Sequence, residues 1–213
     1  MAITEKRPST KYTVGAQYIC FNGTDFDSES YETDVEKLPT VVNIEISDNA
    51  DSYESYASGE VYDSDTIVTY KEISVEQIAF SEEIVAKMRG DDIDTGIIMS
   101  GGIKTRPFFA YGVPIIKKDG TRNMKWFPKC KLTENTDSTA TSSDSHSDQN
   151  DTLTIRAYGF DAEQNQDVSC LTSETANAGI TEDAFFAAPL LTVAAVKALR
   201  PSTGGSTGGS TGG

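Results

Sequence analysis

Segments in which apolar and polar residues alternate run through most of the sequence, and this period of two restricts the fold more than any other feature. Successive side chains of a β-strand point to opposite faces, so such segments predict strands. Strands are expected over residues 12–21, 40–47, 67–80, 152–160 and 166–173. With 213 residues, the chain has the size of one large, mainly β domain.

The strongest local signal is a β-hairpin in residues 108–132. Asp119-Gly120 lies between two β-rich runs and favours a tight turn there. Pro114 and Pro128 indicate sheet edges or bulges. Apolar residues alternate on the first arm and mark the second: Phe109, Tyr111, Val113, Ile115, Met124, Trp126 and Leu132.

Residues 81–89 have the features of a helix. Ser81 is a favoured N-cap, and Gly90 can end the helix. The first turn is acidic and the last is basic, which suits the helix dipole, and an apolar stripe completes the pattern: Glu82, Glu83, Lys87, Arg89, Ile84, Val85 and Met88.

Two further segments carry weaker signals. Residues 181–186, TEDAFF, fit either a second capped helix or a turn that places Phe185 and Phe186 in the core. Residues 95–102, TGIIMSGG, predict a short buried strand.

The remaining segments are polar or rich in turn residues. We expect a solvated loop over 22–37, a mobile loop over 133–151, and a long excursion over 47–66 with a hairpin turn at Ser58-Gly59. The predicted organisation is an N-terminal arm, a single β-rich domain and a flexible Ser/Thr/Gly tail, over residues 1–11, 12–200 and 201–213.

No catalytic or metal-binding arrangement emerges from the sequence. The single histidine, His146, lies in the polar loop, where no scaffold would hold it beside a nucleophile. Asp92, Asp94 and Gly96 alternate as in a calcium loop, but the acid that should end such a loop is missing, which favours a solvated turn. We therefore expect no enzyme activity, no metal and no cofactor.

Composition bounds the location and the partners. No apolar run approaches the roughly 20 residues that cross a bilayer, and the start lacks a secretory signal, so we expect synthesis in the cytoplasm and no membrane contact. A pI near 4.4 disfavours nucleic acid as a tightly held partner. Cys20, Cys130 and Cys170 are odd in number and widely spaced, which predicts buried free thiols.

Basic residues are concentrated between Lys104 and Lys131. Eight Lys and Arg residues stand there against one acid, Asp119, so this segment carries +7, whereas the chain carries −15 and its remainder −22. Opposite charge on two surfaces of one chain would steer self-assembly; the alternative is a basic face that is merely solvated. We predict assembly contacts by these bases and by tyrosines of the excursion: Lys104, Arg106, Lys117, Lys118, Arg122, Lys125, Lys129, Tyr53, Tyr56 and Tyr62.

The order of several stretches resembles the major tail proteins, the tail tube subunits, of long-tailed phages of Gram-positive bacteria. These stretches are LPTVVNIEIS, YASGEVYDSD, VEQIAFSEEIVAKMRG, FFAYGVPIIKKDGTRNMKWFPKCKL and the split TENTDSTATSSDSHSDQNDTLTIRAYG. The likeness is one of pattern and covers about residues 12–187. The stretch from Pro189 onward and the segment FDSESYETDVEK have no counterpart.

The resemblance implies a β-sandwich or β-barrel with one flanking helix, about residues 81–89. It implies hexameric rings that stack into a hollow tail tube for DNA, which is repelled by acidic residues in the channel and only weakly contacted. The implied partners are other copies, the tape measure, the tail terminator and the distal tail protein, and the location is the virion tail. A second interpretation is a different β-rich assembly or adhesion module, such as a capsid decoration or receptor-binding domain.

Overall fold

The computed structural model describes residues 7–137 and 150–201. Residues 1–6 of the predicted arm, most of the predicted mobile loop with His146, and residues 202–213 of the predicted tail lie outside the described residues.

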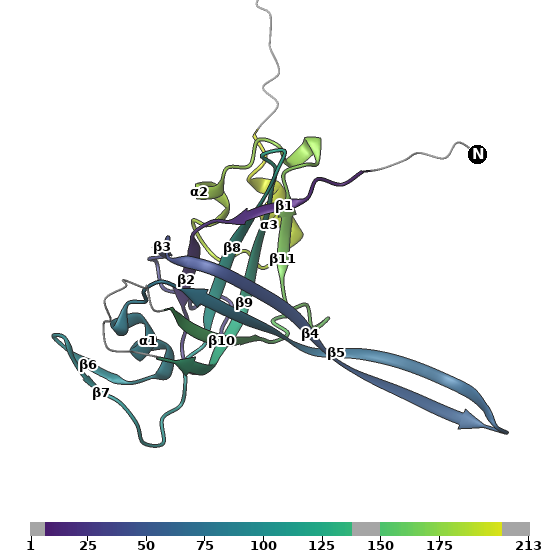
Figure 1. Ribbon diagram of the computed structural model, residues 1–213, viewed down its shortest axis with the longest axis horizontal. Coiled ribbons are helices and arrows are strands. Elements are labelled where there is room, and N and C mark those ends of the chain that lie inside the picture. The colour runs from purple at the N-terminus through teal and green to yellow at the C-terminus, as the bar shows by residue number, and fades with distance from the viewer. Residues whose placement is uncertain (1–6, 138–149, 202–213) are drawn as a thin grey trace, which may run out of the picture.

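The described strands form a nine-stranded sheet and a separate two-stranded hairpin (Figure 1). All pairs are antiparallel, and the prediction of a mainly β fold is confirmed. The main path of the sheet is β3-β2-β8-β9-β10-β5-β4, with β1 beside β8 and β11 beside β9. The bounds are β1 Lys11–Val14, β2 Gln17–Phe21, β3 Glu36–Leu38, β4 Val41–Ala57, β5 Glu60–Gln77, β8 Phe109–Lys117, β9 Arg122–Thr136, β10 Asp151–Ala157 and β11 Val168–Leu171.

The large sheet closes on itself as a barrel. Its edge strands β3 and β4 are consecutive in the chain, separated by two residues, so the two edges must meet. Inside, the side-chain amide of Gln17 on β2 donates to Gln77 on β5 at 2.5 Å, and the Tyr111 hydroxyl donates to Gln17 at 3.2 Å. All three side chains are fully buried. The bond between Gln17 and Gln77 joins β2 to β5, which are not neighbours in the sheet, whereas Tyr111 lies on β8, the neighbour of β2.

The predicted β8–β9 hairpin is the centre of the fold and is buried on both faces. One face packs inside the barrel, and its cluster includes Phe109, Tyr111, Phe127, Ile73 and Ile155. The other face packs against the C-terminal segment. That second cluster includes Tyr18, Met124, Trp126, Phe185 and Phe186, with the rings of Tyr18 and Phe186 stacked at 4.0 Å.

The described residues contain three α-helices, of which α2 and α3 lie together and α1 lies apart from them (Figure 1). Helix α1, Glu82–Arg89, matches the predicted helix and ends at Gly90 in the left-handed region, although the Ser81 side chain makes no capping hydrogen bond. Helix α2, Glu182–Phe185, is capped by Thr181 and buries both predicted phenylalanines. Helix α3, Val193–Ala198, was not predicted and packs Val196 against the second cluster.

Two sequence-based expectations are wrong in detail. The predicted strand 12–21 is interrupted at Gly15 and Ala16, because β1 and β2 pair with different parts of β8. The predicted buried strand in residues 95–102 is exposed: Ile97–Met99 form β7, which pairs with β6, Asp92–Asp94, in a hairpin outside the barrel. The predicted free thiols at Cys20, Cys130 and Cys170 are confirmed and buried.

Gly112 allows the C-terminal layer to approach the sheet. A Cβ atom at this position would lie 2.8 Å from Cε1 of Phe186 and 3.0 Å from Cε3 of Trp126. Substitution Gly112→Ala is therefore expected to displace the Phe186 ring and to lower the free energy of unfolding by about 1–3 kcal/mol. Urea unfolding followed by Trp126 fluorescence measures this, and an unchanged midpoint would contradict the close contact.

Candidate assembly surfaces

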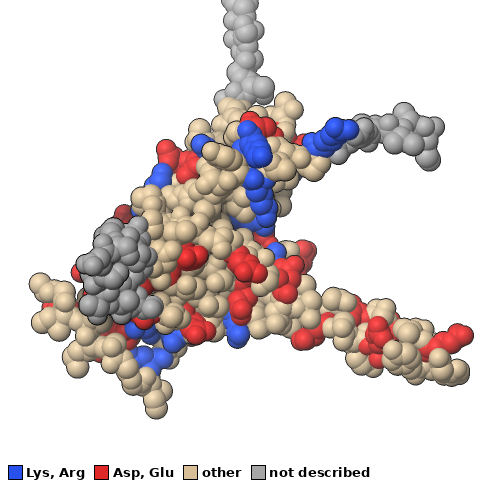
Figure 2. All heavy atoms as spheres, viewed as in Figure 1, with Lys and Arg blue, Asp and Glu red and all other residues tan. Residues whose placement is uncertain are grey.

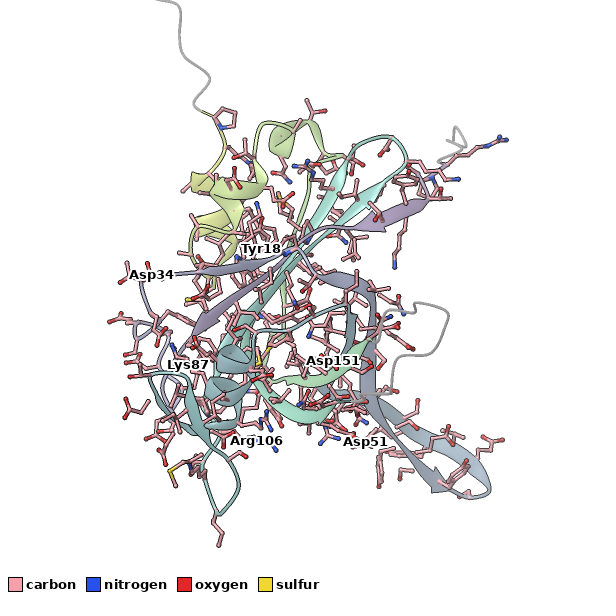
Figure 3. All side chains as sticks on the ribbon, turned by 60° about the vertical axis from the view of Figure 1, so that its left-hand side comes forward. Tyr18, Asp34, Asp51, Lys87, Arg106 and Asp151 are labelled. Carbon is pink, nitrogen blue, oxygen red and sulfur yellow. The ribbon has the colours of Figure 1, made fainter. Side chains whose placement is uncertain are left out.

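The distal part of the β4–β5 hairpin, residues 48–70, stands clear of the barrel as a two-stranded ribbon (Figure 1). It turns at Ser58 and Gly59, both with positive φ, which confirms the predicted turn. This distal ribbon carries six carboxylates and no Lys or Arg residue, as the red and tan surface of Figure 2 shows. The carboxylates are Asp48, Asp51, Glu54, Glu60, Asp63 and Asp65. Figure 3 labels Asp51 where the ribbon leaves the body.

The distal ribbon also exposes aromatic and aliphatic side chains. Tyr62 is 80% exposed, and Tyr53, Tyr56, Val61 and Ile67 are each more than half exposed. The Tyr56 hydroxyl donates to Glu54 at 2.6 Å, and this hydrogen bond raises the Tyr56 pKa. Exposed apolar groups gathered on one element are typical of an interaction surface.

The predicted basic residues do not form one surface, since the β8–β9 strands spread them along the barrel. Three of them pair with carboxylates of the same chain: Lys104 with Asp92 at 2.9 Å, Arg122 with Glu182 at 3.4 Å and Lys125 with Asp167 at 3.3 Å. Arg106, labelled in Figure 3, donates to the carbonyls of Leu132 and Thr133, and Lys129 lies over the rings of Phe26 and Phe108. Much of the +7 is therefore compensated internally.

Lys117 and Lys118 lie at the β8–β9 turn, where β1 brings a third cation beside them. Lys11 is the direct cross-strand partner of Lys117, and the Lys118 amide donates to the Thr10 carbonyl at 3.0 Å. No carboxylate among residues 7–137 and 150–201 makes an ion pair with Lys11, Lys117 or Lys118. We call this group the basic end. Blue atoms gather in the upper part of Figure 2 over β1 and this turn.

Asp119 lies in the same turn but is held by its own neighbours. The amide and hydroxyl of Thr121 donate to the Asp119 carboxylate at 3.0 and 2.6 Å. These hydrogen bonds, with the charge of Lys117, lower the Asp119 pKa. Like charges opposite one another are unfavourable in a sheet, so the basic end would gain from carboxylates supplied by another molecule.

The β6–β7 hairpin is a surface that sequence reasoning missed. Ile93, Ile97, Met99 and Ile103 project into solvent there, and Ile103 is fully exposed. An apolar stretch such as GIIM predicts a buried strand, because the sequence alone does not show whether another element covers it.

No site in the described residues suggests metal chemistry, because no three His, Cys, Asp or Glu side chains gather closely enough to hold an ion. A hollow of about 630 Å³ lies between the loop that precedes β11 and helix α3. Its charged lining residues are Asp161, Glu163, Asp167, Lys197 and Arg200. Within the described part of the chain, no helix has the length and apolar character to cross a membrane.

No protein-family model matches the sequence, and no curated protein matches it. The solved structures to which the chain is similar include two with 10% sequence identity. One is the cap that terminates the tube of the anti-feeding prophage, with a TM-score of 0.43 over 80% of this chain and 96% of that chain. The other is a chain of the PVC sheath-tube complex, an extracellular contractile injection system in its extended state, with a TM-score of 0.40 over 73% of this chain and 88% of that chain. Similarity at this level assigns no function.

Asp167 joins two strands through its carboxylate. It contacts Lys71 of β5 and Lys125 of β9, and all three side chains are largely buried. Burial raises the Asp167 pKa, but the two ammonium groups together outweigh this effect and hold the pKa below its usual value.

Substitution Asp167→Asn is expected to cost about 1–3 kcal/mol of stability at pH 7, because it removes the carboxylate that pairs with Lys125 and leaves Lys71 with Asp48 alone, at 3.7 Å. A carboxyl with a lowered folded-state pKa stabilises the fold above its unfolded pKa, near 4, and this contribution is lost as the pH falls through the folded value. The difference between wild type and variant should therefore be constant from pH 5 to 7 and shrink below about pH 4. Denaturant titrations across this range test it, and a pH-independent difference would contradict the assignment.

Proposed function

We propose that this protein is a structural, non-enzymatic subunit that assembles with copies of itself into stacked hexameric rings, forming the tail tube through which phage DNA passes. The observation that carries the proposal is the distal ribbon. It exposes tyrosines and six carboxylates on an element that touches the body only at its base, through Asp48, Val68 and Tyr70. An element of this kind stabilises little in a lone subunit and is suited to contacts with another.

The charge distribution supports self-association in particular. The distal ribbon is acidic, and the basic end, Lys11 with Lys117 and Lys118, has no ion-pair partner among the described residues. Two surfaces that differ on one molecule make heterologous contacts, which produce rings when they close and filaments when they do not. Charge complementarity would steer these contacts and fix their register.

The finer features of the proposal come from the sequence resemblance to major tail proteins. They are the sixfold ring, the transiting DNA, the location in the virion tail, and contacts with the tape measure, tail terminator and distal tail proteins. The surplus of acid on the chain suits a channel in which DNA phosphates are repelled.

The second candidate is a β-rich decoration or receptor-binding module, which the exposed tyrosines would also suit. The two functions differ in their assembly. A decoration module forms a small closed oligomer at every concentration, whereas a tube subunit forms rings or filaments as concentration rises. Negative-stain electron microscopy of the purified chain over a range of concentration and salt, with light scattering on the same samples, distinguishes them. Discrete monomers, dimers or trimers at every condition would contradict self-assembly into a tube.

Charge reversal at the basic end is the matching prediction. The double variant Lys117→Glu and Lys118→Glu should fold normally but need about tenfold more protein to assemble at low salt. The difference should fade near 1 M salt, where the Debye length is about 3 Å. Light scattering against concentration measures both effects.

A control with the same change of charge is available on helix α3 and just beyond it. Lys197→Glu with Arg200→Glu replaces two exposed cations that are not part of the basic end. This control should assemble like the wild type. If both variants lose assembly equally, the effect comes from net charge and not from the basic end. If the Lys117→Glu, Lys118→Glu variant assembles like the wild type, the basic end is only a solvated surface.

A further inference from the structure

The β6–β7 hairpin and Ile103, in the loop that follows it, expose a group of aliphatic side chains. Ile97, Met99 and Ile103 are 66%, 68% and 108% exposed, and Ile93 is 39% exposed. None of the four belongs to either core cluster. In Figure 1 the hairpin lies at one extremity of the long axis, apart from the barrel.

The hairpin is held in place from both ends. Gly90 ends helix α1 with φ 76, and a Cβ atom on it would lie 2.8 Å from the Thr105 carbonyl oxygen, so the entering and returning chains are in contact. The Lys104 ammonium binds the Asp92 carboxylate at 2.9 Å and the Met99 carbonyl at 3.1 Å, which joins the base of β6 to β7. A surface ordered before binding loses less entropy when it docks.

The matching surface on the same chain is the distal ribbon, residues 48–70. This ribbon carries the exposed Tyr53, Tyr62 and Ile67. In Figure 1 it extends to the opposite extremity of the long axis from the β6–β7 hairpin, so one molecule cannot bring the two surfaces together. Two copies placed head to tail can bring the ribbon of one against the β6–β7 hairpin of the other. Apolar groups then meet apolar groups in a contact that repeats from copy to copy.

Charge complementarity supports this pairing over one between two ribbons. A shallow hollow at the base of the β6–β7 hairpin is lined by Arg89, Lys104, Arg106 and Asp91. Arg89 pairs with Asp91 at 3.6 Å and Lys104 with Asp92 at 2.9 Å, so Arg106 is the base of the hollow that makes no ion pair with a carboxylate of the described residues. Figure 2 shows blue atoms at this end of the molecule and none on the ribbon. Six carboxylates on one ribbon would repel those of another but would be attracted to this hollow.

We infer that the β6–β7 hairpin, with the basic hollow at its base, is the docking site for the distal ribbon of a second copy of this chain. The inference rests on the self-assembly of the proposed function and assigns the acceptor surface. The basic end at the β8–β9 turn is left for other acidic surfaces of neighbouring copies.

The direct test uses single-cysteine variants, because the native thiols are buried and leave surface cysteines to react alone. Tyr62→Cys and Ile97→Cys proteins, mixed in equal amounts under mild oxidation, should form disulfide-linked heterodimers in excess of both homodimers. The matched control pairs Tyr62→Cys with Val193→Cys, since Val193 is 67% exposed and lies on α3. Cross-linking equal to the control would overturn the inference.

A complementation experiment tests direction. The double variant Tyr53→Ser, Tyr62→Ser disables the distal ribbon, which is the donor surface. The double variant Ile97→Ser, Met99→Ser disables the β6–β7 hairpin, which is the acceptor surface. Each double variant should raise the protein concentration needed for assembly about tenfold or more. Sedimentation of the mixed variants should show heterodimers that do not grow, because one donor and one acceptor remain intact. Val193→Ser is the control and should assemble like wild type.

The outcomes separate the two proposals. If the acceptor variant assembles like wild type, the docking site is wrong while self-assembly stands. If the wild type forms no rings or tubes but the specific cross-link appears, tube assembly fails while the docking site stands.

Discussion

The closure of the sheet between β3 and β4 determines what can lie outside the barrel. The chain passes from one edge to the other through Pro39 and Thr40, so every strand on the path has its place fixed by this connection. Within the barrel β5 pairs with the seven residues of β10, but β5 itself has 18 residues. Its excess length has no strand beside it except β4, and the two must leave the body together as a ribbon. The buried link of Gln17, Gln77 and Tyr111 opposes any slip of register, because a slip by one residue would exchange the two faces of a strand.

A ribbon with two unpaired edges is open to unwanted strand pairing, and its composition opposes this outcome. Exposed N–H and C=O groups along a strand edge recruit other strands, and charged side chains are the usual protection. Here the protection has one sign only, since all six charged residues are carboxylates. The distal ribbons of two copies therefore repel each other, while the exposed tyrosines can still contact a neutral or basic surface. The same residues that prevent an isologous contact favour a heterologous one.

Local patterns predicted the hairpin of residues 108–132, helix α1 and the turn at Ser58-Gly59, because alternation, capping residues and turn residues act over a few positions. The sequence failed where the answer depends on distant neighbours. The apolar residues of β7 gave the same signal as a core strand, although no element of the described residues buries them. The bases of residues 104–131 seemed to form one surface, but their carboxylate partners Asp167 and Glu182 come from distant parts of the chain. A run of bases in the sequence shows only that these residues are close along the chain. Whether they form one surface depends on the direction of their strands and on the carboxylates that pair with them.

Several bases of residues 104–131 are paired within the subunit, so the bases without an ion pair in the described residues are the ones available to another molecule. Arg122 and Lys125 contribute to folding through Glu182 and Asp167, so their charges are already used within the subunit. Lys11 and Lys117 oppose each other across β1 and β8, an arrangement that costs free energy in the isolated molecule. That cost falls when an external carboxylate approaches, so these charges favour association more than folding. The barrel thus owes its stability to buried side chains, while under the proposed self-assembly its exposed appendages and its basic end would gain stabilisation from a second molecule.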